Sequence, residues 1–569
     1  MALVSDWAFE TDLAVVGSGA AGLAAALTAS IDGLDALVIE KTAHYGGTTA
    51  LSGGVLWVPG NARMQHPDAA NDVQRALSYL EHHVGNRVGA EKLRAFVTEA
   101  PRMLDHLLHH SQLDVETFFG FPDYRPHSPG ALVEGRSVEP RVVAGRRLGK
   151  HLGTLRSRGP IAPAGIVGTM AELRQLASAR ANPGQLLKAW RLLPRNLWNR
   201  AAGRKHLANG AALIARLRLS LLERQVPLWL NASLTELLVE NGGVIGLSVD
   251  VGGQRRNVRA RKGVVLAAGG FERNAEMRRE HLPAEPDAGY TSGSEGNTGD
   301  AIQAGMAIGA AVDLMDDAWW APTFMPPGGA PQIVIFERAK PGNIIVDAAG
   351  QRFANEADPY NDLVKQMQEA QQAGAAAIPA HMVFDHAYRA KYPIGGMLPG
   401  VTPKRHIDSG FVIRADTLDD LARQAGIDAD GLTATVARFN AMAAEGRDDD
   451  FHRGESAFDR FSGDPAVGPN PCLAPLDKPP FYAMKLYPGD LGTKGGLLTN
   501  EFAQVMDTDG APLPGLYAAG NASASVMGNF YPGAGGTIGP AMTFAYIAAR
   551  HAAERTPKST PPVQAQIPQ

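Results

Sequence analysis

A glycine-rich turn near the start of the chain has residue types and spacing suited to holding a phosphate group. It reads GSGAAG over residues 17–22. Glycines at these positions permit a tight turn and let backbone N–H groups approach a pyrophosphate at a helix N-terminus. Glu40 stands about 20 residues further on, where its carboxylate can accept a hydrogen bond from a ribose hydroxyl. A purely structural turn would not call for this acid, so we predict a dinucleotide site.

The residues on either side of the turn supply the elements that must position it. Residues 12–16 are typical of a buried strand, residues 23–30 of an Ala- and Leu-rich helix, and residues 36–39 of a second strand that ends at Glu40. Strand, turn, helix and strand in this order are the context in which the motif binds a dinucleotide. The pattern therefore predicts an α/β fold with a Rossmann-like sheet.

Several small-residue segments later in the chain are expected to join the same site. Residues 46–54 (GGTTALSGG) suit packing against a flat ring or a diphosphate. Residues 263–270 and 514–521 read as strands that run into glycines, and residues 535–540 open a helix over 541–553. A C-terminal helix that rejoins an N-terminal site implies that another domain is inserted between them.

The order of these segments predicts how the chain is divided. We expect a nucleotide domain at residues 1–290 and 486–555, with a basic helical excursion at about 141–210. A smaller α+β domain is expected at residues 291–485. The tail, residues 556–569, is rich in Pro, Gln and Thr and is expected to be disordered.

Composition excludes several classes of protein. With 569 residues, 45% apolar and 20% charged, the chain can build a large core and is neither disordered nor fibrous. The single cysteine, Cys472, excludes a disulfide scaffold, a zinc ribbon and an iron–sulfur protein. A net charge of −4 offers no general attraction to nucleic acid. The N-terminus lacks the basic and apolar regions of a signal peptide, and no apolar run reaches the roughly 20 residues of a membrane span, so we expect a cytoplasmic protein.

Taken together, the motifs resemble a known family over most of the chain. They resemble the FAD-dependent 3-ketosteroid Δ1-dehydrogenases, which belong to the wider fumarate reductase flavoprotein group. The resemblance implies a Rossmann-like FAD-binding domain interrupted by a smaller α+β catalytic domain, with FAD bound noncovalently. It is carried by GSGAAG at 17–22, GGTTALSGG at 46–54, TGDAIQAG at 298–305, GQRFANEADPY at 350–360, GLYAAGN at 515–521 and GNFYPGAGGTIGPAMTFAY at 528–546.

The glycine motifs and the resemblance together indicate which residues would bind FAD. The last motif is the most specific, because nucleotide binding alone does not require Tyr-Pro-Gly-x-Gly before a helix. The predicted FAD-binding residues are Gly17, Gly19, Ala20, Ala21, Gly22, Glu40, Lys41, Gly47, Thr48, Thr49, Ser52, Gly53, Gly54, Ala268, Gly269, Asp300, Gly520, Asn521, Gly536, Thr537 and Ile538.

The family's reaction removes two hydrogens from ring A of a 3-ketosteroid and leaves a C1–C2 double bond. The C2 proton is acidified when the C3 carbonyl is polarised, so it can leave to a base. The C1 hydrogen is not acidified and leaves as a hydride to the flavin N5. Such a site needs a clamp for the C3 oxygen, a base and the flavin.

Four residues match the family's catalytic positions. Tyr531 and Gly535 match the clamp, through a phenol O–H and a backbone N–H. Tyr360 matches the base, and Tyr124 matches a second tyrosine expected to lower the pKa of Tyr360. That help is needed because an unperturbed phenol has a pKa of about 10. Packing roles for Tyr531 and Tyr124, and a helix-start role for Gly535, are the alternatives.

Two departures from the fumarate reductases bear on the substrate. Those enzymes have an arginine where Tyr360 stands and a histidine where Gly492 precedes a Thr-x-Gly-Gly loop. Without these cationic partners for a dicarboxylate, the substrate should be neutral and apolar. The remaining alternatives are dehydrogenation at C4–C5, an enone or fumarate-type reductase, and a noncatalytic flavin module that docks on membranes. The aromatic cluster at residues 319–325 lines a steroid cleft or is ordinary core.

Metal and redox partners can also be anticipated. His106, His109 and His110 share a helix without an accompanying acidic ligand, so no catalytic metal is expected. No NAD motif accompanies the FAD motif, which favours a quinone or another acceptor as the oxidant.

A strongly basic segment leaves two interpretations open. Between residues 141 and 205 the single acid among many lysines and arginines is Glu172. Residues 176–207 interleave Leu and Trp with Lys and Arg, as an interfacial helix on an anionic membrane would. A solvated helical excursion whose arginines cover apolar surface explains the same pattern.

Overall fold

A computed structural model describes residues 6–65, 69–157, 166–178, 192–283 and 287–555. Its first sheet is mainly parallel, and the described strands follow the order β20-β21-β11-β1-β2-β8. The antiparallel strands β9 and β10 extend this sheet from β11. The bounds are β1 (Phe9–Val16), β2 (Ala36–Ile39), β8 (Leu228–Trp229), β9 (Ala232–Glu240), β10 (Gly243–Val251), β11 (Gln254–Leu266), β20 (Gln504–Met506) and β21 (Pro512–Ala518).

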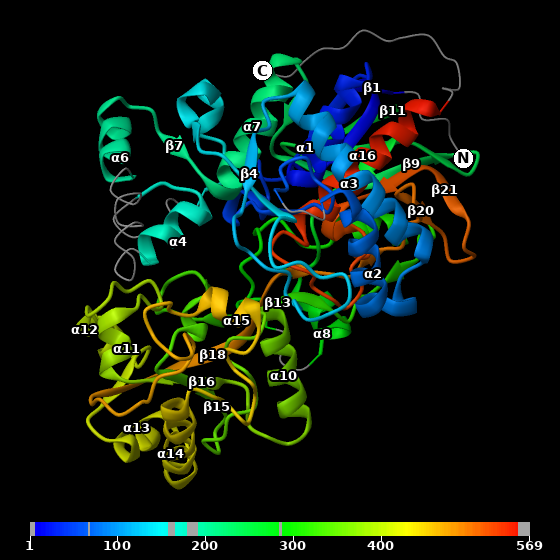
Figure 1. Cartoon of the computed structure of the whole chain (residues 1–569). Coiled ribbons are helices and arrows are strands. Elements are labelled where there is room, and N and C mark those ends of the chain that lie inside the picture. Colours follow the sequence, from blue (N-terminus) through cyan, green and yellow to red (C-terminus); the bar gives the residue numbers. More distant parts are fainter. Residues whose placement is uncertain (1–5, 66–68, 158–165, 179–191, 284–286, 556–569) are drawn as a thin grey trace.

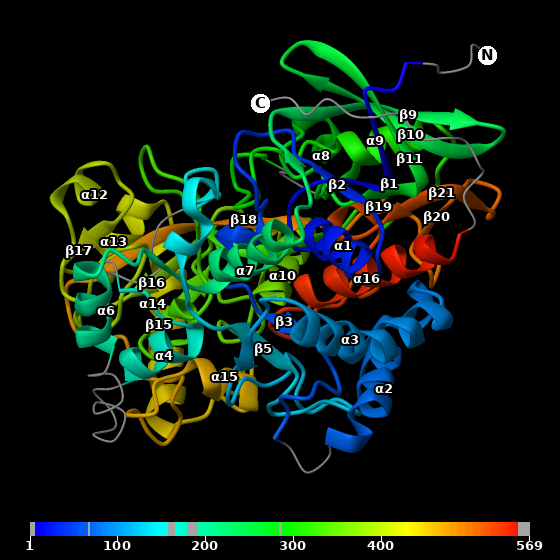
Figure 2. The same ribbon diagram turned by 90° about the horizontal axis from the view of Figure 1, so that it is seen from above.

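Three helices cover one face of this sheet, and a fourth packs on their outer side. Helices α1 (Ala20–Ile31), α7 (Asn209–Glu223) and α16 (Ile538–Glu554) pack beside one another, with α3 (Ala90–His110) outside α16 (Figure 2). The strand, helix and strand predicted around the glycine turn are confirmed as β1, α1 and β2. Helix α1 begins earlier than predicted, at Ala20, because the last glycine of the motif forms part of its first turn.

The second sheet is antiparallel and lies beside the first (Figure 1). Its strands are β13 (Ala318–Phe324), β14 (Gln332–Ile333), β15 (Asn343–Val346), β16 (Ala380–Phe384), β17 (Ile413–Ala415) and β18 (Phe481–Thr493). Helices α10 (Tyr360–Gln372), α13 (Leu418–Ala425) and α14 (Ala429–Glu445) pack on this unit. The mixture of helices and strands confirms the predicted α/β fold class. The proposed domain limits stay a prediction; strands of the first sheet come from residues 9–266 and 504–518.

Shorter elements surround the two sheets. A three-stranded antiparallel sheet of β3 (Leu56–Trp57), β5 (Ser137–Pro140) and β4 (Val115–Thr117) adjoins the glycine-rich C-terminal loop. The others named here are α2 (Asp72–Val84), β6 (Val143–Ala144), α4 (Met170–Ser178), α6 (Leu192–Ala201), β7 (His206–Leu207), α8 (Ala275–His281), α9 (Asp300–Met306), β12 (Val312–Asp313), α11 (His386–Lys391), α12 (Lys404–Asp408), α15 (Ala457–Ser462) and β19 (Gly496–Leu497).

The described helices of the basic segment, α4 and α6, lie outside the first unit, on the side of α11 and α12 (Figure 1). Its helices α4 and α6 are joined by an ion pair of 2.5 Å between Arg195 and Glu172. Leu197 and Trp198 on α6 are each 67% exposed. Much of the predicted amphipathic stretch, residues 179–191, lies outside the described residues. Within the described ranges, no helix combines the length and the apolar character needed to cross a bilayer.

Candidate active site

A cavity of about 1580 Å³ brings together segments that are far apart in the sequence. Ligand pockets usually enclose roughly 300–1,000 Å³, so this cavity has room for a dinucleotide and a second molecule. The predicted FAD-binding residues that line it are Gly17, Gly19, Ala20, Ala21, Glu40, Lys41, Gly47, Thr48, Thr49, Ser52, Gly53, Gly54, Ala268, Gly269, Asp300, Gly520, Asn521, Thr537 and Ile538.

Gly22 and Gly536 do not line the cavity. A Cβ on Gly22 would collide with the carbonyl oxygen of Gly17, and a Cβ on Gly536 would lie 2.8 Å from Cδ of Pro532. Both positions need glycine because neighbouring backbone and ring atoms pack closely there. Their packing explains why glycine stands at both positions, and their part in binding FAD stays a prediction.

The turn between β1 and α1 fits a pyrophosphate. Gly17 has a φ of +107° and no room for a side chain against Ala267, so only glycine allows this tight turn. A Cβ on Gly19 would find Thr49 Oγ1 as its nearest neighbour at 3.8 Å, which leaves the backbone open to the cavity. The Ala20 N–H donates to Thr49 Oγ1 at 3.2 Å. An anion here would lie at the N-terminus of a 12-residue helix, where the dipole stabilises it.

Glu40 is held in place at the end of β2 by its own hydrogen bonds. Its Oε2 accepts from the hydroxyl of Ser18 at 2.5 Å, and its Oε1 accepts from the N–H and the hydroxyl of Thr42 at 2.9 and 2.8 Å. A carboxylate has about four acceptor positions, so one remains for a ribose hydroxyl. The next residue, Lys41, forms a 2.5 Å ion pair with Asp300 on the same wall.

Three of the four predicted catalytic residues are tyrosines, and their rings meet on the wall of this cavity. The Tyr360 hydroxyl donates to the Tyr531 hydroxyl at 2.8 Å, and the Thr537 hydroxyl donates to the same oxygen at 3.3 Å. The ring centroid of Tyr124 lies 5.7 Å from that of Tyr360 and 5.1 Å from that of Tyr531. All three side chains are buried. The arrangement places two phenol oxygens where a small polar group of a ligand can meet them.

Burial controls the protonation of this cluster. It raises the pKa of Tyr360 well above the usual value of a phenol, and the adjacent Tyr124 and Tyr531 raise that pKa further. Burial also raises the pKa of Tyr124 and that of Tyr531. Tyr124 therefore does not lower the pKa of Tyr360 in this structure, contrary to the expectation from the sequence. The physical reason is that Tyr360 acts as a proton donor in the hydrogen-bonded cluster.

The loop that follows Tyr531 is fixed by backbone contacts. The carbonyl oxygen of Pro532 accepts from the Tyr124 N–H at 2.9 Å and from the Tyr79 hydroxyl at 3.0 Å. Gly535 has a φ of +91° and presses against the backbone of Trp57, whose N–H donates to the Gly535 carbonyl at 3.1 Å. No described residue accepts a hydrogen bond from the Gly535 N–H, which lies on the cavity wall. This donor is therefore available to a ligand.

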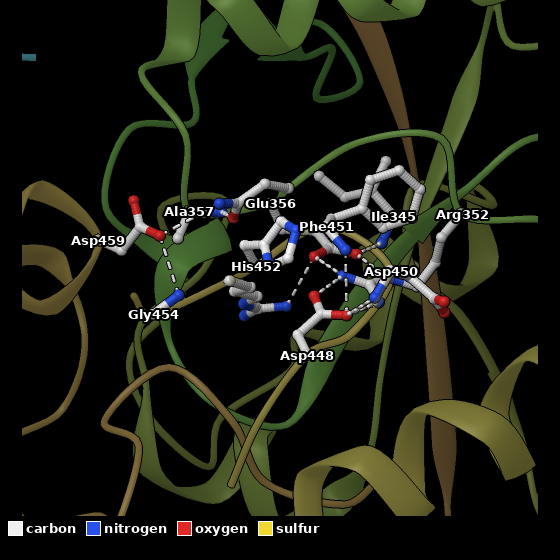
Figure 3. Close-up of polar contacts among 12 residues, drawn as sticks. Ile345, Arg352, Glu356, Ala357, Asp448, Asp450, Phe451, His452, Gly454 and Asp459 are labelled. Carbon is white, nitrogen blue, oxygen red and sulfur yellow. Dashed lines mark hydrogen bonds and ion pairs between the residues drawn. The ribbon is translucent and has the colours of Figure 1, made fainter. Parts of the chain in front are cut away.

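A buried ionic network fixes the segment that leads to Tyr360, the first residue of α10 (Figure 3). The carboxylate of Glu356 accepts from Arg352 at 2.8 and 2.7 Å and from Arg453 at 3.1 Å. Arg352 also donates to Asp448 at 2.8 Å. Two buried cations thus face two buried anions, and each charge is compensated. The network holds residues 352–356 and so determines where α10 begins.

Apolar residues that the sequence analysis did not single out line the cavity beside the tyrosines. They come from the loop after β4, from β14 and the segment that follows it, and from the loop after α11. No local pattern distinguishes them from ordinary core residues. The cluster at residues 319–325, by contrast, does not line the cavity and packs in the core, since Trp319 and Trp320 are each 2% exposed. The lining residues are Phe118, Phe121, Ile333, Ile335, Phe336, Ile394 and Met397.

A buried acid next to the cofactor side of the cavity was also missed. Glu272 accepts a hydrogen bond from the Asn297 side chain at 2.6 Å, and the same amide donates to the Thr48 hydroxyl at 3.0 Å. Burial raises the pKa of Glu272 to about 7. Thr48 and Asn297 line the cavity, so this buried carboxyl is one residue away from it.

The histidines on α3 do not contribute to the cavity. The rings of His106 and His110 lie 5.1 Å apart, and His109 Nδ1 lies 2.7 Å from the Asp105 carbonyl oxygen. Among the residues that the structure describes, no three His, Cys, Asp or Glu side chains gather as metal ligands.

Comparison with known proteins identifies the family. Residues 12–538 match the family described as FAD binding domain. A 3-oxosteroid 1-dehydrogenase of Mycobacterium tuberculosis is 44% identical over 96% of this chain and 99% of its own length. The structure of 3-ketosteroid delta1-dehydrogenase from Sterolibacterium denitrificans in complex with 1,4-androstadiene-3,17-dione is 42% identical with a TM-score of 0.91, over 96% of this chain and 99% of that one. A 4-oxocyclohexanecarboxylate 2-dehydrogenase of Sinomonas cyclohexanicum is 36% identical over 95% of this chain and 92% of its own length. The resemblance is confirmed, and the chain belongs to the family of FAD-dependent flavoproteins that includes the 3-oxosteroid 1-dehydrogenases.

Proposed function

We propose that this protein dehydrogenates 3-ketosteroids between C1 and C2 with FAD as the oxidant. The observation that carries the proposal is the hydrogen bond of 2.8 Å between Tyr360 and Tyr531 on a wall that also presents the Gly535 N–H. The same cavity holds the segments that fit a dinucleotide. A neutral, apolar ring system suits the hydrophobic residues beside the tyrosines.

Tyr531 and Gly535 act on the C3 carbonyl oxygen of the substrate. The Tyr531 hydroxyl accepts from Tyr360 and from Thr537, which leaves its own proton to donate to a ligand. Together with the Gly535 N–H it forms a pair of neutral donors in a buried site. Neutral donors are strengthened where water is excluded, and they stabilise the charge that develops on the oxygen as the C2 proton leaves.

Tyr360 takes the C2 proton. Its raised pKa makes the deprotonated form a strong base, although that form is scarce at neutral pH. The Tyr124 ring packs edge-on against the Tyr360 ring, with 5.7 Å between the ring centroids. We assign Tyr124 to holding the Tyr360 ring in place. A flavin bound beside this wall would supply the hydride acceptor for the C1 hydrogen.

One experiment tests the reaction and its position on the ring. The FAD-loaded protein is mixed without oxygen with 4-androstene-3,17-dione, which is saturated at C1–C2. We expect bleaching of the oxidised flavin band and formation of a 1,4-diene. A matched 5α-reduced steroid with a C1–C2 double bond is the control, because only an enzyme acting at C4–C5 would oxidise it. Bleaching by the control alone would overturn the assignment to C1–C2.

We further propose a quinone as the physiological electron acceptor. The sequence has no NAD motif beside the FAD motif, so a small diffusing quinone is favoured over NAD. Multiple turnover of the steroid with a soluble quinone, and not with NAD, is the expected result. Equal turnover with NAD would overturn this part of the proposal.

We also propose that α6 contacts anionic membranes. The exposed Leu197 and Trp198 stand on a basic segment, which suits an interface between lipid headgroups and acyl chains. Trp198→Ser should reduce co-sedimentation with anionic vesicles, whereas Phe502→Ser, at an exposed aromatic residue elsewhere, should not. Unchanged co-sedimentation of the Trp198 variant would exclude this contact.

A further inference from the structure

Two lysine side chains hold the backbone immediately before Tyr531. Lys494 Nζ donates to the carbonyl oxygen of Phe530 at 3.3 Å. Lys365 Nζ donates to the carbonyl oxygen of Asn529 at 2.7 Å. These are successive carbonyl groups, so the two ammonium groups fix the direction in which the chain enters Tyr531.

Both lysines share one carboxylate. Asp317 Oδ2 lies 3.0 Å from Lys494 Nζ and 3.1 Å from Lys365 Nζ. Asp317 Oδ1 accepts from the Trp320 indole N–H and from the Ala318 N–H, each at 2.8 Å. The carboxylate is therefore anchored at the start of β13, and it transfers that rigidity to both ammonium groups.

Lys494 has a second route to Tyr531 through an aromatic ring. Its ammonium lies 4.9 Å from the centroid of the Trp319 ring, at a distance typical of a cation–π contact. The Trp319 ring in turn meets the Tyr531 ring edge-on, with 4.8 Å between centroids. The side chain of Lys494 is 0% exposed. A cation so deeply buried is costly unless it is paired, and its partners all lead to the loop of Tyr531 or to β13.

The two lysines also connect the clamp to the base. Lys494 follows the end of β18, whereas Lys365 belongs to α10, the helix that begins with Tyr360. The cluster of Lys494, Lys365 and Asp317 therefore joins the loop of Tyr531 to the helix of Tyr360. A displacement of the Tyr531 loop or of α10 would change the distance of 2.8 Å between the two phenol oxygens.

We propose that Lys494, assisted by Lys365, is a positioning residue that sets the Tyr531 hydroxyl against Tyr360 and the C3 oxygen. The proposal rests on the proposed function, because it assumes that Tyr531 acts on the C3 oxygen. Lys494 touches neither substrate nor cofactor in this scheme; it acts through Tyr531. Misplacement of a reacting group by about 1 Å can cost on the order of 100-fold in rate.

A double-mutant cycle with Tyr531→Phe tests the proposal in the full-length, FAD-loaded protein. Lys494→Met keeps an unbranched side chain but removes the ammonium. We expect kcat to fall on the order of 100-fold, while KM and the spectrum of the bound flavin change little. In the double variant, Lys494→Met should cause no further loss beyond that of Tyr531→Phe, because the hydroxyl that it positions is absent.

Lys92→Met is the matched control. Lys92 is also a deeply buried lysine whose pKa burial lowers to about 8, as for Lys494, and it donates to the Ala524 carbonyl at 3.1 Å. Its loss removes a comparable buried ammonium away from Tyr531, so kcat should stay near the wild-type value. An equal loss of kcat in Lys92→Met would show a general effect of removing a buried lysine and would overturn the proposal.

The remaining outcomes separate this inference from the proposed function. A normal rate for Tyr531→Phe alone would refute the proposed role of Tyr531. A slow Tyr531→Phe combined with a full additional loss from Lys494→Met would refute the positioning role only. If Lys494→Met does not retain FAD, Lys365→Met takes its place in the cycle with the same expectations, since the Lys365 side chain is 25% exposed and tolerates replacement better.

Discussion

Replacing Tyr360 by phenylalanine separates its chemical role from its packing role. The change removes one oxygen atom and leaves the ring between Tyr124 and Tyr531, at centroid distances of 5.7 and 5.4 Å. The hydrogen bond to Tyr531 is lost, but the Tyr531 hydroxyl keeps its contact with Thr537 at 3.3 Å. One such hydrogen bond contributes about 1 kcal/mol to stability. The Tyr360→Phe protein should therefore fold and bind FAD.

The catalytic cost should be much larger than the structural one. A positioned general base contributes roughly 10²–10⁴-fold to a rate, which corresponds to about 3–5 kcal/mol of activation free energy. We expect the rate of flavin reduction by 4-androstene-3,17-dione to fall by that factor, as measured by stopped-flow absorbance without oxygen. Exchange of the C2 proton with deuterated water, which needs the base but not the hydride step, should fall with it.

Tyr517→Phe provides the matched control. Tyr517 is also buried, and its hydroxyl makes a hydrogen bond of 2.9 Å with Nδ1 of His551, away from the cavity. This variant should reduce its flavin at the wild-type rate. Near-normal flavin reduction and C2 exchange in Tyr360→Phe would refute the role of Tyr360 as base. An equal loss in Tyr517→Phe would show that removing any buried phenol oxygen slows the reaction.

Three further predictions concern pH, buried charge and the clamp loop. The pKa of Tyr360 is raised, so its phenolate becomes more populated as the pH rises toward that pKa. We therefore expect kcat/KM to increase toward alkaline pH. A pH–rate profile that is flat in this range would contradict the role of Tyr360 as base. The Glu272 carboxyl keeps its proton up to a pH of about 7 in the folded protein but loses it near 4.5 when unfolded, so its contribution to stability declines as the pH rises between these values. In chemical denaturation, the free energy of unfolding of Glu272→Gln should rise by ~3 kcal/mol relative to that of the wild type as the pH increases across that interval. A difference in unfolding free energy that does not change with pH would show that the pKa of Glu272 is not raised. Gly535→Ala places a Cβ 2.5–2.6 Å from the backbone of Leu56 at a φ of +91°, and steady-state turnover should fall on the order of 100-fold. Gly510→Ala has a similar φ of +84° and open space, so it should affect only stability, and equal loss of turnover in both variants would argue against a specific role of Gly535.

Local patterns pointed to most of the small residues that line one side of the cavity. The glycines at 17 and 19 and the acid at 40 are separated by one strand, one turn and one helix, so their relative positions follow from short-range geometry. Gly22, in the same motif, does not line the cavity and packs closely against Gly17. A glycine motif shows that a side chain does not fit at a position, but it does not show whether the neighbouring backbone or a bound ligand occupies that space.

The substrate half was less predictable from the residues themselves. The tyrosines were found through the family motif, whereas Ile333, Ile335 and Met397 carry no pattern that separates a cavity wall from a core. Lys494 and Lys365 were likewise missed, because their common partner Asp317 lies far from either in the sequence. The raised pKa of Tyr360 depends on burial beside the rings of Tyr124 and Tyr531, which only the packed structure defines.

The position of β21 and α16 has a consequence for biosynthesis. Strand β21 pairs with β11 within the first sheet, and α16 packs on α1, so the last elements of the chain complete a unit that the first elements begin. Nascent chains fold from the N-terminus as they leave the ribosome. Until β21 has emerged, the last residues of β11, 264–266, lack their second neighbouring strand, and until α16 has emerged, the face of α1 that it covers stays exposed. We therefore expect FAD capture to follow translation, and a chain truncated before Pro512 to be synthesised without its cofactor and to need a chaperone to stay in solution.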